Sequence, residues 1–447
     1  MSFRGHRSKD PKYVITLALA VVTLFGMPLH AQEQPTLTDQ DDPAVIGDRQ
    51  FSDAPTNTRV RRQLGNVPDD IGYQLQESDD TIDAMFRRGP LTPVHNVWDA
   101  ATEHLRESIG LDLGLNYTAV YQRADTTVRG PRDAVGGDLD FFGRWLLLGD
   151  EDYWPGSLTF SSETRHRYSD ISPADLNTGT VGGTIVSFGT QDFSLVQLYW
   201  ESGSFDESLL LRIGKMDPAL IWDGGRFVSS NYAFLSPAFS DTLPMPLPAA
   251  GLGIAGAVYP TDSTYIVAGI HDANAKRTTA GFDTFFGEGE YFTAVEFGWF
   301  PGEGEPSEGM YHVTLWSSDP RRDAGRPSDR GIALTLEQQF GCEGNLVPFV
   351  RYAYAHRGVN DIRENLSIGL GIENMLGQND DVIGLAWSWE EPSNPSLRDQ
   401  FVFESFYRFY ITPYTHLTPD IQVVIDPANA PGKDTVVIFG LRLRTLF

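Results

Sequence analysis

Two segments of the chain alternate apolar and polar side chains with a period of two. In the first, residues 110–122, one face carries Leu111, Leu113, Leu115, Tyr117, Ala119 and Tyr121. The opposite face carries Asp112, Gly114, Asn116, Thr118 and Gln122, with Val120 as an exception. In the second, residues 436–447, the alternating faces carry Val437, Phe439, Leu441, Leu443 and Phe447 against Gly440, Arg442 and Arg444. Successive side chains of a β-strand point to opposite faces, so both segments are predicted to be strands.

The same alternation recurs from about residue 110 onward, in segments separated by Gly, Pro, Asp and Asn. We predict sixteen strands, near 111–122, 139–147, 157–168, 193–203, 207–214, 252–259, 264–271, 290–299, 310–318, 331–340, 345–356, 366–373, 381–389, 401–411, 417–426 and 436–447. Bacterial single-chain membrane barrels have an even number of strands. The long, irregular intervals 169–192 and 215–251 are predicted to be loops that can fold inward.

The predicted fold class is all-β, a transmembrane antiparallel β-barrel spanning residues 96–447. After residue 31, no apolar run approaches the roughly 18 to 20 residues that a membrane-spanning helix needs. Helices and closed barrels are the structures that satisfy every backbone polar group in lipid. The alternative is a soluble sandwich, which would bury the apolar faces in a core. Sixteen strands favour a barrel with an aqueous channel.

The first 31 residues resemble a secretory signal peptide. The apolar stretch from Tyr13 to Leu29 precedes Ala31, a small residue at the expected cleavage position. The basic residues before this stretch are Arg4, Arg7, Lys9 and Lys12. A membrane anchor is the alternative, but the apolar stretch is short and an acidic segment follows it directly. The sequence therefore predicts export.

Residues 32–95 form an acidic leader, with twelve Asp and Glu against six Arg and no Lys. No sustained period is visible, so we predict a disordered or loosely structured segment. It is either a periplasmic extension or a partial plug of the barrel, and the sequence does not choose between them. A short helix over residues 94–109 is predicted to cover the barrel entrance.

The net charge is −26, and it is near −29 without the basic residues 1–31. So acidic a chain is predicted not to bind nucleic acid, whose phosphates it would repel. No cofactor or metal site is predicted, because the nine histidines show no paired spacing. No catalytic site is predicted either: Glu390 and Glu391 are adjacent and would point to opposite faces of a strand, and no G-x-S-x-G motif occurs.

The C-terminal third resembles the carbohydrate-selective porin (OprB) family. The blocks that carry the resemblance are FESFYRFYIT at 403–412, LTPDIQ at 417–422 and VIFGLRL at 437–443. LRIGKMD at 211–217 and GIHDANA at 269–275 match more weakly, with Ala275 where proline is usual in the family. The resemblance covers residues 110–447 and implies a distant member. It implies a sixteen-stranded outer-membrane barrel that passes small carbohydrates by diffusion, without a cofactor.

A sugar channel needs aromatic faces and groups that exchange hydrogen bonds with hydroxyls along its wall. Charge on the lipid face is costly, so strand parity predicts that charged residues face the lumen. The candidate solute-binding residues are Glu163, Arg165, Arg212, Glu296, Arg351, Glu404, Arg408, Asp420, Arg442 and Arg444. For each of them, the simpler interpretation is a solvated wall residue without a role in selectivity.

Phe447 ends the last predicted strand on its apolar face. A terminal aromatic residue in this position is predicted to be the signal that barrel-assembly machinery recognises. The interpretation is an outer-membrane porin of a Gram-negative-type envelope, with small carbohydrates and membrane lipid as its partners. The alternatives are a channel for other small or anionic solutes or an exported polymer, and a secreted β-rich carbohydrate-binding or hydrolytic protein. The oligomeric state, monomer or trimer, remains open.

Overall fold

The computed structural model describes residues 64, 67–79, 82, 84–149, 156–204, 208–301, 309–321, 324–341, 345–374 and 380–447. The predicted signal peptide and most of the acidic leader lie outside these residues. No helix in the described part of the chain is long and apolar enough to cross a membrane.

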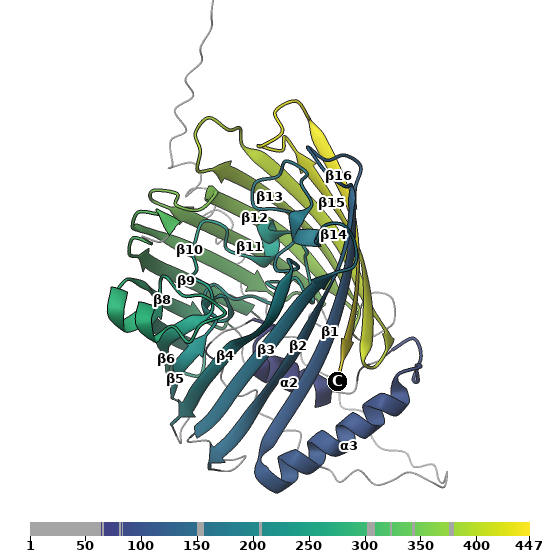
Figure 1. The fold of residues 1–447 in the computed structure, drawn as a ribbon, viewed down its shortest axis with the longest axis vertical. Helices are drawn as coiled ribbons and strands as arrows, with labels where there is room; N and C mark the ends of the chain where they lie inside the picture. Colours follow the sequence, from purple (N-terminus) through teal and green to yellow (C-terminus); the bar gives the residue numbers. More distant parts are fainter. Residues whose placement is uncertain are drawn as a thin grey trace, which may run out of the picture. The chain divides into compact units, whose positions relative to one another are not determined.

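Sixteen antiparallel strands close into one barrel (Figure 1). The strands are β1 (Leu111–Ala124), β2 (Asp133–Leu148), β3 (Gly156–Arg167), β4 (Gln191–Gly203), β5 (Leu209–Met216), β6 (Gly251–Thr261), β7 (Thr264–Asp272), β8 (Tyr291–Trp299), β9 (Gly309–Ser318), β10 (Asp329–Gln338), β11 (Leu346–Ala355), β12 (Ile362–Glu373), β13 (Val382–Pro392), β14 (Gln400–Thr412), β15 (Thr415–Ile425) and β16 (Thr435–Leu446). The predicted fold class and strand count are confirmed.

The barrel closes where β1 pairs with β16. The register runs from Asn116 opposite Leu446 to Ala124 opposite Ile438. Phe447 extends this pairing, because its backbone exchanges hydrogen bonds of 2.8 and 3.0 Å with Leu115. The two segments with the clearest alternation in the sequence therefore meet at the seam.

Alternation along β16 separates a lipid face from a lumen face. Leu441 and Leu443 are 42% and 41% exposed on the outside, whereas Arg442 and Arg444 are fully buried within the barrel. In a membrane barrel, the outward apolar side chains contact lipid and the inward ones can be polar. This arrangement confirms the orientation that the strand period predicts.

Short and long connections between the strands lie at opposite ends of the barrel. Short turns, such as 262–263 and 413–414, lie at the end that carries Phe447, which we call the turn end. The longer connections lie at the opposite, loop end. Two of them, the 168–190 loop and the 217–250 loop, turn back into the barrel. The short elements within the long connections are η1 (Pro173–Asp175), η2 (Pro218–Leu220), α4 (Pro237–Ser240) and η3 (Thr284–Glu288).

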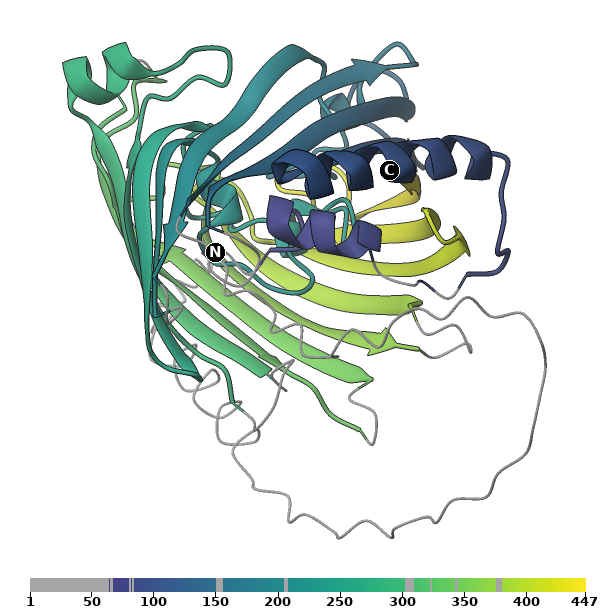
Figure 2. The ribbon, with the colours of Figure 1, turned by 90° about the horizontal axis from the view of Figure 1, so that it is seen from below.

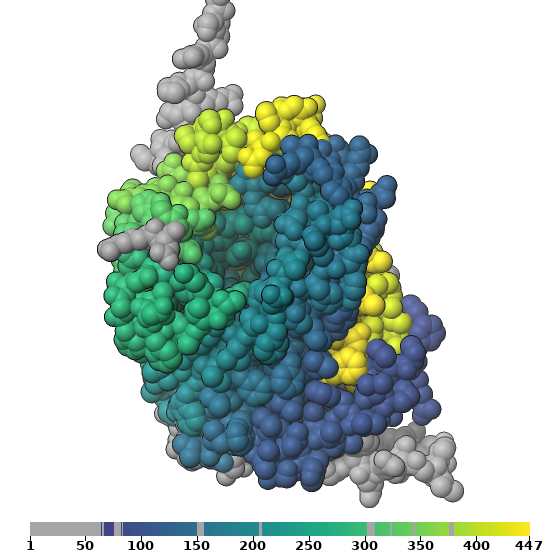
Figure 3. Space-filling view, in the orientation of Figure 1, coloured from purple at the N-terminus to yellow at the C-terminus, as the bar shows by residue number. Residues whose placement is uncertain are grey.

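Both inward loops contact lumen-facing side chains. The backbone N–H groups of Leu235 and Ser236 donate to Glu404 on β14. The Gln400 amide exchanges hydrogen bonds with the backbone of Val181. The prediction that these two loops fold inward is confirmed, and Figure 3 shows the hollow that remains between the walls.

Two helices of the chain precede the barrel at its turn end (Figure 2). Helix α2 (Ile71–Asp79) falls within the predicted leader, and α3 (Thr92–Ile109) confirms the helix predicted at 94–109. Helix α3 ends at Gly110, whose φ of 68° lies in the left-handed region that glycine adopts readily. Before it, the N–H groups of Met85 and Phe86 donate to the carbonyl groups of Tyr410 and Ile411 at the end of β14.

His95 fixes α3 against the seam. Its ring stacks on Tyr414 with the centroids 4.0 Å apart, and on Phe447 with the centroids 4.2 Å apart. The side chain is 1% exposed, and neither ring nitrogen has a hydrogen-bond partner among the described residues. Burial without a compensating charge lowers the pKa of His95 to about 4.

We expect Leu441→Arg to lower the free energy of unfolding by about 2–4 kcal/mol, because it places a charge at mid-depth on the lipid face. The matched control is Thr435→Arg at the exposed end of the same strand, with an expected cost of about 0–1 kcal/mol. Denaturant titration of the protein in lipid bilayers, followed by tryptophan fluorescence, measures both. Equal losses in the two variants would contradict the assignment of the lipid face.

Docking of α3 is expected to weaken as the pH falls. The pKa of His95 is about 4 when docked and about 6.5 when free, so the undocked state binds the proton more tightly. The stabilisation from neutral His95 is complete above about pH 6.5 and is lost as the pH falls towards 4. The rate of limited proteolysis at Arg106, divided by the rate for an unstructured peptide at the same pH, should therefore rise over this range. His95→Phe keeps a stacking ring, and it should make this ratio nearly independent of pH.

Candidate functional site: the channel interior

All ten residues predicted to face the lumen do so. Eight are buried and two, Arg165 and Arg408, are partly exposed. They do not form one cluster. Most contact segments of the chain that fold into the barrel, and Glu163 and Arg165 belong to a charged group on the wall.

Arg351 on β11 holds the 217–250 loop. Its Nη2 atom lies 2.7 Å from Oδ2 of Asp223, and both side chains are at most 5% exposed. Its other donor groups reach the carbonyl of Phe239 at 2.8 Å and the hydroxyl of Thr242 at 2.8 Å. Thr242 also donates to Asp223. A guanidinium with this many acceptors joins two distant parts of one loop to the wall.

Glu296 on β8 supports the same loop from the adjacent wall. Its carboxylate accepts from the N–H of Asp223 at 3.0 Å, from the hydroxyl of Tyr265 at 2.9 Å and from Thr314 at 2.5 Å. The Nδ1 atom of His312 lies 3.5 Å from the same carboxylate. Glu296 thus serves the loop and not an open channel surface.

The far side of the loop is held by β14 and β16. Arg442 donates to the carbonyls of Ser230 and Ala233 at 2.6 and 2.9 Å. Arg408 donates to the carbonyl of Tyr232 at 3.2 Å. Asp420 is buried beside Glu404, which binds the loop through Leu235 and Ser236. Arg442, Arg408 and Glu404 thus pair with backbone groups that would otherwise lack partners inside the barrel.

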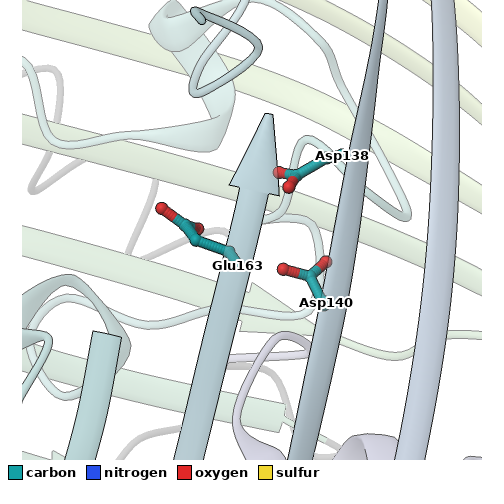
Figure 4. Close-up of side chains that lie close together, drawn as sticks. All are labelled: Asp138, Asp140 and Glu163. Carbon is teal, nitrogen blue, oxygen red and sulfur yellow. The ribbon is translucent and has the colours of Figure 1, made fainter. Parts of the chain in front are cut away.

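A charged cluster lies on the wall formed by β2 and β3 (Figure 4). Asp138, Asp140 and Glu163 bring one carboxylate oxygen each within 4.8 Å of one another. Arg165 donates to Asp138 at 3.0 Å and to Glu163 at 2.7 Å. Arg277, from the β7–β8 connection, donates to Glu163 and lies 3.2 Å from Asp217. Because two guanidinium groups contact Asp138 and Glu163, this part of the cluster is a network of ion pairs.

Arg212 on β5 and Arg444 on β16 contact the chain that precedes the barrel. Arg212 lies 2.9 Å from Asp70 and also donates to Glu201. Arg444 donates to Gln74 at 3.0 Å and to Thr118 at 2.6 Å. Each guanidinium also lies over a tyrosine ring, Tyr199 for Arg212 and Tyr232 for Arg444. Both predicted lumen residues therefore bind a segment of their own chain.

The sequence analysis did not predict several residues of the barrel interior. Asp223, Thr242, Arg226 and Arg277 lie in connections, where no two-residue period marks a side chain as inward. Arg226 lies 3.1 Å from Glu373 at the turn end of β12 and is one-third exposed. For Asp223, Thr242 and Arg226, the one indication in the sequence was the length of the 215–251 interval, which predicted an inward loop. Nothing in the sequence marked Arg277.

Comparisons with known proteins show which family this chain belongs to. The model of the carbohydrate-selective porin, OprB family, matches residues 173–447. The chain belongs to this family. The match includes all three blocks of residues on which the resemblance was based, and it begins at the first inward loop.

The relatives of this OprB family member are also porins. It is 27% identical over 311 residues to porin AaxA of Chlamydia abortus, which covers 67% of each chain. It is 25% identical over 309 residues to porin AaxA of Chlamydia felis, which covers 67% of this chain and 68% of that one. The high-pH structure of Pseudomonas putida OprB superposes with a TM-score of 0.65 at 14% identity, over 78% of this chain and 97% of the other. The last comparison shows the shared fold.

We expect Arg351→Met to destabilise the protein by about 3–5 kcal/mol, because it leaves Asp223 buried and without its cation. The control is Arg330→Met, an exposed arginine on neighbouring β10, which should change the free energy of unfolding by less than about 0.5 kcal/mol. Denaturant titration measures the difference. Channel recordings of Arg351→Met should also show larger current fluctuations as the 217–250 loop loosens. Identical stabilities of the two variants would exclude this role for the ion pair.

Proposed function

We propose that this porin lets small carbohydrates diffuse passively across the outer membrane of a Gram-negative-type envelope. The observation that carries the proposal is the match to the carbohydrate-selective porin family over residues 173–447. The barrel supports it, because sixteen strands enclose a lumen wide enough for an aqueous path. Family and fold both point to a channel, and we propose that the protein catalyses no reaction.

The charged pairs that remain partly exposed are the best candidates for contact with a solute. In the Arg277–Asp217 and Arg226–Glu373 pairs, the arginine side chains are 25% and 33% exposed. Glu163 and Arg165 adjoin the first pair. Paired acceptors and donors of this kind can exchange hydrogen bonds with sugar hydroxyls without requiring a charged solute. Weak binding at several such pairs would allow both entry and release.

Six of the candidates would act indirectly, through the 217–250 loop. Glu296, Arg351, Glu404, Arg408 and Arg442 contact this loop, and Asp420 lies beside Glu404, so the six residues would set the width of the path. We propose that these six residues shape the channel, whereas Glu163 and Arg165 face the solute. We also propose that Phe447, paired with β1 at the seam, is recognised by the barrel-assembly machinery.

Liposome swelling tests the solute class. Proteoliposomes should swell faster in glucose and maltose than in small anions or in uncharged solutes of equal size that lack a ring of hydroxyl groups. Equal rates for all solutes of one size would refute carbohydrate selectivity. Faster entry of small anions would favour the alternative, a channel for anionic solutes.

We expect the double variant Glu163→Gln/Arg165→Gln to reduce the preference for glucose by about tenfold, the equivalent of losing one charge-assisted hydrogen bond to the solute. The matched control is Arg132→Gln/Asp133→Asn, two exposed residues where the β1–β2 connection meets β2, which should leave the preference unchanged. Salt conductance of both variants shows whether the channel is still open. An unchanged preference in the first variant would exclude this pair from the solute path.

A further inference from the structure

A segment of the chain that precedes the barrel lies inside it. Residues 67–79, which we call the plug segment, include helix α2 (Figure 2). Helix α2 contacts β1 and β2 from within. Val67, Asp70, Ile71 and Leu75 are all less than a tenth exposed. Burial to this degree beside lumen-facing residues places the segment in the lumen, at the turn end.

Apolar contacts hold one face of the plug segment. Ile71 and Leu75 pack against Phe142, an inward residue of β2, and the three form a separate buried cluster. Leu64, just before the segment, is 1% exposed and joins the cluster that contains Tyr199 and Trp222. These residues belong to the wall and to the 217–250 loop, so the chain just before the segment is packed into their cluster.

Polar contacts on the same segment reach two arginines of the wall. Asp70 lies 2.9 Å from Arg212, and both side chains are 3% exposed. Gln74 accepts from Arg444 at 3.0 Å. A third contact joins the loop, because the amide of Asn231 donates to Asp69 at 2.9 Å. The segment thus presents one carboxylate and one amide to guanidinium groups on β5 and β16.

Both arginines keep other partners in the wall or in the 217–250 loop. Arg212 also pairs with Glu201, and Arg444 also donates to Thr118 and to the hydroxyl of Tyr232. If the segment withdrew, neither guanidinium would be left buried without an acceptor, and Asp70 would regain water. The usual penalty for breaking a buried ion pair arises from the stranded partner, so here that penalty is reduced. The inserted and the withdrawn arrangements of the plug segment can therefore lie close in free energy.

The chain that follows the segment fixes the side from which it enters. Met85 and Phe86 pair by backbone hydrogen bonds with the turn end of β14, and α3 then lies across the turn end of the seam. Withdrawal towards the turn end would need rearrangement of the residues before Met85, whereas the barrel strands and α3 could stay in place. The pairing of Met85 and Phe86 with β14 thus keeps the plug segment near the turn end of the barrel after the segment leaves the lumen.

We propose that residues 67–79 form an internal plug, in which Asp70 and Gln74 occupy an arginine site that solutes bearing hydroxyl or carboxylate groups can reach when the plug withdraws. The proposal rests on the proposed function, since it assigns regulation to that channel. In the plugged state Arg212 and Arg444 are covered. In the open state they line the lumen, and Arg444 stays in contact with Tyr232 of the 217–250 loop.

Single-channel recording in potassium chloride tests the plug. Asp70→Arg places a second cation against Arg212 and should expel the segment. The ratio of time in the high-conductance state to time in the plugged state should rise about a hundredfold, which corresponds to about 3 kcal/mol. The matched control is Glu103→Arg on the exposed face of α3, which makes the same change of charge outside the lumen and should leave the ratio unchanged.

A second measurement follows the segment directly. In a Cys342→Ser background, Gln74→Cys should react slowly with a membrane-impermeant maleimide, and adding Asp70→Arg should accelerate labelling by a similar factor. Heat-modifiable gel migration checks that each variant contains a folded barrel. If folded Asp70→Arg matches Glu103→Arg in conductance and Gln74→Cys labels at the same rate with and without Asp70→Arg, the plug is refuted.

The outcomes separate this proposal from the proposed function. Raised conductance of Asp70→Arg without any preference for sugars would support the plug and refute carbohydrate selectivity. Preference for sugars with unchanged conductance would support carbohydrate selectivity and refute the plug. Addition of acetate or glucose to Asp70→Arg should lower its open conductance through binding at the uncovered arginines, and no change with either solute would refute the arginine site.

Discussion

Backbone pairing between β1 and β16 is the interaction on which the rest of this structure depends. A strand edge exposed to lipid would leave a row of unpaired N–H and C=O groups, so a membrane sheet must close on itself. Closure here joins residues more than 300 positions apart, such as Asn116 and Leu446. It also fixes the faces, because the register that pairs the strands turns Leu441 outward and Arg442 inward. Helix α3 and the stacked rings of His95, Tyr414 and Phe447 then cover the turn end of this seam.

Closure produces an interior that must accommodate charge. The guanidinium groups of Arg351, Arg442 and Arg444 are almost fully buried, and each is surrounded by carbonyl, hydroxyl or carboxylate oxygens. Many of those oxygens come from segments folded into the lumen. A buried arginine and an inward loop thus satisfy each other, because neither would be stable in the barrel without the partner's polar groups. In this OprB family member, much of the polar wall therefore holds chain segments in place, and a smaller set of charged pairs remains accessible to solutes.

The width of the channel is consequently decided by three inserted segments more than by the strand count. The 168–190 and 217–250 loops enter from the loop end, and the plug segment enters from the turn end. The loops are bound through many wall residues, whereas the described polar contacts of the plug segment with the wall centre on Asp70 and Gln74, which contact Arg212, Arg444 and Asn116. This difference in attachment suits permanent shaping by the loops and reversible occupancy by the plug segment.

The sequence by itself determined the barrel, the sixteen strands, the inward orientation of the ten charged residues and the family. A period of two is a local property of the chain, and the cost of charge in lipid converts it directly into an inside and an outside. Glycine weakened this signal in β2. The strand begins at Asp133, but its start was predicted near residue 139 because Gly136 and Gly137 supply no side chains to the pattern. A Cβ at Gly136 would lie 2.7 Å from Pro173 of the inward loop, so the position must stay small. Only the tertiary structure decided what each charged residue contacts. The partners of Arg351 and Arg212 lie 128 and 142 positions away, and no local pattern encodes a pairing over that separation.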